Sequence, residues 1–162
     1  MPMALNSKGT TRTPDFLAVQ RAAIVDAAVA AVVDAHASHY DSAGPDEIRA
    51  RLDALFDRLV DASATRDLGG VVAYARRLAG ERFSAGYDLS EVQTAINALE
   101  EAVWGRVFSE LQPREFAEAL GLVTTTLGAA KDALAREYVS LATRAHAPSL
   151  DLRALFAGVD QA

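Results

Sequence analysis

Apolar residues recur along this chain at the three- and four-residue spacing of α-helices, in five segments separated by short breaks. These segments predict helices from residue 14 to about 39, 45 to about 64, 71 to about 85, 88 to about 111 and 113 to 147. The last segment keeps a seven-residue repeat through Phe116, Leu120, Val123, Leu127, Ala130, Leu134, Tyr138 and Leu141. No strand pattern competes with this reading. We predict an all-α fold of about five long helices, as an antiparallel bundle or a globin-like crossing, because periodicity does not fix packing angles.

Residues with specific backbone preferences mark the ends of these segments. Thr13 and Pro14 are typical of a helix start, with Thr13 as the cap. Gly86 supplies the left-handed backbone that commonly ends a helix. Asp88 and Glu91 then have the spacing of a capping box at the start of the next helix.

The chain divides into one main region and two short ends. We expect residues 1–13 to be a disordered leader, residues 14–147 to be a single helical domain and residues 148–162 to be an apolar tail. The leader lacks the apolar core of a secretory signal, and we find no apolar run long enough to span a bilayer. We therefore expect a cytoplasmic protein with no membrane partner.

Composition narrows the classes of partner. The 162 residues include no cysteine, which excludes disulfides and thiol-ligated metals. The formal net charge of −6 does not favour nucleic-acid binding, and the modest cluster of Arg76, Arg77 and Arg82 does not change this. We expect no nucleic-acid partner.

Histidine offers one weak alternative for metal binding. His36 and His39 lie three residues apart, so they share one helical face and have the spacing to hold a metal. They also fall in the last turn of the first predicted helix, where the helix dipole favours protonated histidine. No Glu-x-x-His motif occurs, which excludes a di-iron bundle site. We predict no metal and no cofactor.

Catalytic motifs are missing as well. The pairs Glu100–Glu101 and Glu115/Glu118 fall on regular helices that are predicted to face solvent. No Gly-x-Ser-x-Gly motif and no glycine-rich phosphate loop is present. We predict that the protein has no catalytic residue and is not an enzyme.

The segment from Arg76 to Trp104 contains a distinctive helix, sharp turn and second helix, with Phe83 and Tyr87 placed to clamp the two helices together. Its pattern residues are Arg77, Leu78, Arg82, Phe83, Gly86, Tyr87, Asp88, Leu89, Glu91 and Val92, followed by a Glu-Glu-Ala-Val-Trp run. This segment resembles the N-terminal sensor domain of RsbR-type (RsbRD-like) stressosome co-antagonist proteins. The resemblance implies a globin-like domain without haem that forms a homodimer and passes a signal to an output domain or a partner regulatory protein. The tail would then be the stub of a connector.

We therefore expect a non-enzymatic sensor or scaffolding domain of a bacterial stress-response-type regulator, acting through homodimerisation. The predicted interface residues are Trp104, Leu120, Leu127, Leu134 and Leu141. The alternative is a bundle that binds a small apolar molecule or haem. The small side chains of Ala28, Ala31 and Ala35 leave either a close helix contact or a cavity.

Overall fold

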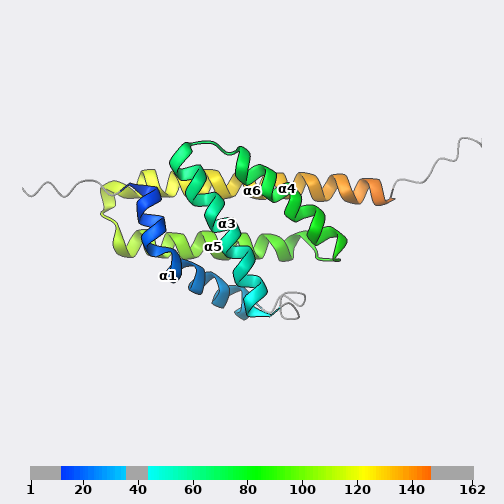
Figure 1. Cartoon of the computed structure of the whole chain (residues 1–162), viewed down its shortest axis with the longest axis horizontal. Helices are drawn as coiled ribbons and strands as arrows, with labels where there is room; N and C mark the ends of the chain where they lie inside the picture. Colours follow the sequence, from blue (N-terminus) through cyan, green and yellow to red (C-terminus); the bar gives the residue numbers. More distant parts are fainter. Residues whose placement is uncertain (1–11, 36–43, 147–162) are drawn as a thin grey trace, which may run out of the picture.

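The computed structural model describes residues 12–35 and 44–146, and these fold into helices joined by short turns (Figure 1). The helices are α1 (Thr13–Asp34), α3 (Pro45–Thr65), α4 (Gly69–Ser84), α5 (Leu89–Glu110) and α6 (Pro113–His146). The described residues contain no strand. The all-α prediction is confirmed. Residues 1–11 of the predicted leader, the tail, His36 and His39 lie outside the described residues, whereas Thr13, which we assigned to the leader, is already helical.

The helices do not all run in the same direction, and some cross others at steep angles (Figure 1). α5 and α6 run antiparallel, side by side, and α3 crosses steeply in front of them. α1 packs against α3 and α5, while α4 packs along α6. This arrangement differs from a bundle in which all helices are nearly aligned, and it places residues from every described helix in one apolar core.

The buried side of α1 differs from the predicted stripe. Ala28 is buried as expected, but Ala31 and Ala35 are exposed, and Val25 and Val32 lie in the core instead. An alanine-rich helix that is apolar on most sides gives little direction to such a prediction. The small residues at positions 31 and 35 therefore do not line an internal cavity.

Both ends of α1 also differ from expectation. Arg12 is the N-cap, and Thr13 is already helical and buried. The helix ends at Asp34, short of the predicted position near residue 39, with Ala35 donating its N–H to Ala31 O at 3.0 Å. The other helix boundaries lie within one or two residues of the predicted ones, with Pro45 and Pro113 in first turns.

By length and composition, α1 is apolar enough to cross a membrane, contrary to our expectation that no segment would be. Its polar side chains nevertheless bind to α3. Arg21 pairs with Asp53 at 3.0 Å and with Asp57 at 2.6 Å, and Asp26 pairs with Arg49 at 2.6 Å. These ion pairs, together with the buried apolar side, make α1 a core helix of this fold.

Candidate functional site

The turn between α4 and α5 is a Schellman motif centred on Gly86, which has φ of +82°. The Tyr87 N–H bonds to Arg82 O at 3.0 Å, and the Gly86 N–H bonds to Phe83 O at 3.1 Å. The Arg82 guanidinium lies over the Tyr87 ring, 4.8 Å from its centroid. The predicted glycine stop is confirmed, and Arg82 and Tyr87 add a cation–π contact across it.

The start of α5 uses the next two pattern residues. Asp88 and Glu91 form a capping box, in which the Asp88 N–H donates to Glu91 Oε2 at 2.8 Å. This confirms the capping prediction. The turn therefore ends one helix and begins the next with backbone groups satisfied on both sides.

A third helix fastens this turn to the body of the protein. The Phe83 ring meets the Tyr138 ring of α6 edge to face, with centroids 5.7 Å apart, and the Tyr138 hydroxyl donates to Tyr87 O at 3.2 Å. The sequence suggested that Phe83 and Tyr87 would clamp α4 to α5, and in the structure each of them also contacts α6, Phe83 through its ring and Tyr87 through its carbonyl oxygen. We use the name Gly86 corner for six of the ten pattern residues together with Tyr138 of α6. The six are Arg82, Phe83, Gly86, Tyr87, Asp88 and Glu91.

The predicted interface residues divide between core and surface. Leu127 and Leu134 are fully buried within one chain, so they serve the core of the protomer. Trp104, Leu120 and Leu141 are partly exposed. Only these three remain accessible to a second copy, because the α6 repeat is used largely to pack against the other helices of the same chain.

Two aromatic residues that we did not single out as interface residues lie beside this surface. Phe108 is 56% exposed, and its ring meets that of Phe116 edge to face, with centroids 5.2 Å apart. Trp104 lies one turn before Phe108 on α5, and Leu120 lies one turn after Phe116 on α6. Because the helices are antiparallel, all four residues follow one another along the same side of the pair. We call Trp104, Phe108, Phe116 and Leu120 the α5–α6 face.

Farther along the same helix pair, Lys131 binds two residues of α5. Its ammonium lies 2.6 Å from Glu100 Oε2 and 3.2 Å from Asn97 Oδ1. Glu100 is buried, unlike its predicted solvent-facing position. The Lys131 ammonium therefore compensates the charge of this buried carboxylate at the contact between α5 and α6.

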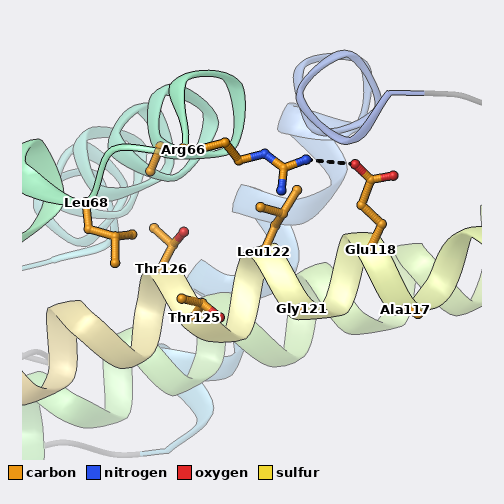
Figure 2. A pocket seen from close by; sticks show the side chains of 9 residues that line it. Arg66, Leu68, Ala117, Glu118, Gly121, Leu122, Thr125 and Thr126 are labelled. Atoms are coloured by element: carbon orange, nitrogen blue, oxygen red, sulfur yellow. Dashed lines mark hydrogen bonds and ion pairs between the residues drawn. The ribbon is translucent and has the colours of Figure 1, made fainter.

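A groove of about 440 Å³ opens where the end of α3 and the loop before α4 approach α6 (Figure 2). It is lined by Ala62, Arg66, Leu68, Ala117, Glu118, Gly121, Leu122, Thr125 and Thr126. Arg66 Nη2 and Glu118 Oε1 form an ion pair, 2.9 Å apart. The sequence did not reveal this groove, because its residues come from two segments that are at least 49 positions apart.

A smaller apolar pocket of about 20 Å³, enough for about one water, lies between α3, α4 and α5. Tyr74 lines it, and its hydroxyl donates to Arg51 O at 3.3 Å. Burial raises the pKa of Tyr74, with a smaller contribution from the nearby Glu81 carboxylate. The Arg77 guanidinium lies 5.5 Å from the centre of the same ring.

Most of the polar side chains that we considered for catalysis or metal binding have structural contacts where the structure describes them, whereas Glu101 is exposed. Within residues 12–35 and 44–146, no group of three His, Asp or Glu side chains is arranged to hold a metal ion. The ring Nδ1 of His146 lies 2.7 Å from Ala142 O. Glu115 accepts from the Gln112 N–H at 2.9 Å, and Glu118 pairs with Arg66.

Comparison with known proteins places the Gly86 corner in a family context. The model of the RsbT co-antagonist protein rsbRD N-terminal domain matches residues 22–155, which include α3 to α6 and most of α1. Searches of curated proteins and of solved structures gave no match. The family is one of non-catalytic regulatory domains of stressosome-type signalling. Because the match covers most of its length, the chain belongs to the family of RsbT co-antagonist rsbRD N-terminal domains.

Proposed function

We propose that this protein is a cytoplasmic, non-enzymatic signal-input domain of a bacterial stress-response-type regulator, and that it works as a homodimer. Its family supports the signalling role. The observation that supports the proposed homodimer is the α5–α6 face, where Phe108 is more than half exposed beside three partly exposed apolar residues.

Three features make this face suited to a protein partner. It combines two phenylalanines, a tryptophan and a leucine, and aromatic residues are enriched in the buried centres of interfaces. Trp104 Nε1 is enclosed and has no hydrogen-bond acceptor among residues 12–35 and 44–146. Gly105, beside it, has no neighbouring atom within 4 Å of a Cβ position, so another backbone can approach closely there.

A second copy of the chain is the occupant that we propose. A twofold axis through the α5–α6 face would pair this face of one protomer with the same face of the other, so one surface would serve both partners. The fully buried Leu127 and Leu134 stabilise α6 within each protomer. Dimerisation can therefore proceed without opening the core.

The dimer is tested by sedimentation or light scattering from low to high micromolar concentration. We expect a dimer for the natural sequence and a monomer for Phe108→Glu at matched concentration, because two buried carboxylates would meet near the axis. Val19→Glu is the control, since Val19 is 81% exposed on α1 and lies outside the face. A natural protein that stays monomeric, or a Phe108→Glu variant that stays dimeric, contradicts the proposal.

We propose that α6 delivers the signal to an attached output domain or to a partner regulatory protein. This single helix contributes to the α5–α6 face, to the Gly86 corner through Tyr138 and to the groove through Glu118. A change in its position therefore alters all three regions together.

A further inference from the structure

The groove between α3 and α6 has the size and chemistry of a ligand site. Its volume of about 440 Å³ falls within the range of small-molecule pockets. Apolar side chains and a glycine form much of its lining, and the threonines at 125 and 126 add hydroxyl groups. Figure 2 shows Leu122 pointing from α6 toward the Arg66 guanidinium, so an apolar surface lies directly beside a cation.

Arg66 is held over the groove by an unusual backbone. Its φ of +61° makes it the one non-glycine residue with positive φ among residues 12–35 and 44–146. Glycine adopts this conformation at lower cost, and it is the usual residue at this position after a helix. The conformation directs the arginine side chain across the groove to Glu118.

The ion pair itself shows that a carboxylate can bind to Arg66 at this place. Both side chains are largely exposed, at 62% for Arg66 and 53% for Glu118, so their attraction contributes little to stability. Glu118 has solvent beside it and can turn away without leaving a buried charge. The guanidinium offers several donors in one plane, which suits a carboxylate better than a single point charge does.

We infer that this groove binds an amphipathic carboxylate, whose apolar body lies against Leu68 and Leu122 and whose carboxylate replaces that of Glu118 on Arg66. The ligand would bridge the end of α3 and the first half of α6. This inference does not depend on dimerisation, because neither Phe108 nor Trp104 lines the groove.

The binding test uses octanoate below its micellar concentration, with isothermal titration calorimetry and thermal unfolding. We expect saturable binding and a raised Tm with octanoate, and weak or absent binding with octanol and octylamine, which share its apolar chain. Octanol binding as tightly as octanoate would show that Arg66 plays no part. Preference for octylamine would assign the charge recognition to Glu118 and overturn the inference.

Substitutions of the two members of the ion pair should change the affinity for octanoate in opposite directions. Glu118→Gln should tighten octanoate binding several-fold, because it removes the competing carboxylate. Arg66→Gly should weaken binding about tenfold or more, the loss expected from one charge-assisted contact. Since glycine suits φ of +61°, this variant should keep the stability of the natural protein. Equal binding by both variants would contradict the inference.

Gly121 allows the groove to be filled without disturbing the core. A Cβ at Gly121 meets no atom within 4 Å, so Gly121→Leu should fold normally and block octanoate. Gly80→Leu on α4 is the matched control, because its Cβ position is equally open and it does not line the groove. Natural affinity in the Gly121 variant, or equal loss in both variants, would overturn the inference.

Discussion

The ring of Phe83 meets the ring of Tyr138 edge to face, with centroids 5.7 Å apart and planes at 83°. The Tyr138 hydroxyl also donates to Tyr87 O at 3.2 Å, on the other side of Gly86. One residue of α6 therefore holds both ends of the turn between α4 and α5. The Gly86 corner therefore joins the turn between α4 and α5 to α6 in this chain.

Removing the Tyr138 hydroxyl tests this joint. Tyr138→Phe keeps the ring contact with Phe83 but leaves Tyr87 O without that donor, so we expect a loss of about 1 kcal/mol in unfolding free energy. Urea unfolding measures it. Val139→Ala, at an exposed neighbouring position, should change stability by less than about 0.5 kcal/mol. Equal effects of the two substitutions would argue against the anchoring role of Tyr138.

Alanine substitutions at two glycines, Gly80 within α4 and Gly86 just after it, should change the free energy of unfolding in opposite directions. Gly86→Ala should destabilise by about 1–2 kcal/mol, because φ of +82° is unfavourable for a residue with Cβ. Gly80→Ala should stabilise by up to about 1 kcal/mol, since it lies within α4 and its Cβ position is open. Thermal and urea unfolding of both variants check the prediction. A shift of the same sign in both would show that the turn is not limited by its backbone conformation.

Breaking the ion pair between Lys131 of α6 and Glu100 of α5 is expected to cost more stability than breaking a surface ion pair. Lys131→Met leaves the buried Glu100 carboxylate without its cation and should cost about 2 kcal/mol. Adding Glu100→Leu should restore most of this loss, because no charge then remains buried. For comparison, Arg136→Met breaks an exposed pair with Asp132 and should cost less than about 0.5 kcal/mol. A double variant no more stable than Lys131→Met would contradict this account.

The buried Tyr74 should make the folded state lose stability at alkaline pH. Burial raises its pKa above the usual value of about 10, so the folded state binds the phenolic proton more tightly than the unfolded state does. This contribution is complete below the pKa of the unfolded chain and is lost as the pH rises toward the folded pKa. Urea unfolding between about pH 8 and pH 11 should show a steeper decline for the natural protein than for Tyr74→Phe. Parallel declines would assign the pH dependence to other groups.

Local patterns predicted most of the helices and their ends. The apolar spacing and residues such as Pro45, Gly86 and Asp88 act within one or two turns of chain, so the sequence alone was sufficient there. Thr13 is an exception, because it became helical and buried when α1 packed. Tertiary contacts decided that boundary.

Features that combine distant segments were not predictable in the same way. The repeat on α6 indicated a packing surface, but it could not show that Leu127 and Leu134 face their own chain, since that depends on how the other helices cross. The groove needs Arg66 and Glu118, which are 52 positions apart. In α1, the near-continuous apolar composition concealed which side would be buried.

The 34-residue length of α6 gives it a span of about 51 Å as a straight helix. A stiff rod of this kind transmits a twist along its axis with little loss. A rotation of about 20° would move every side-chain tip by about 2 Å, given a helix radius of about 5 Å. Torque applied near Glu118 would therefore reach Tyr138, more than five turns away, and the buried side chains between them, such as Leu127 and Leu134, would repack as the helix turns.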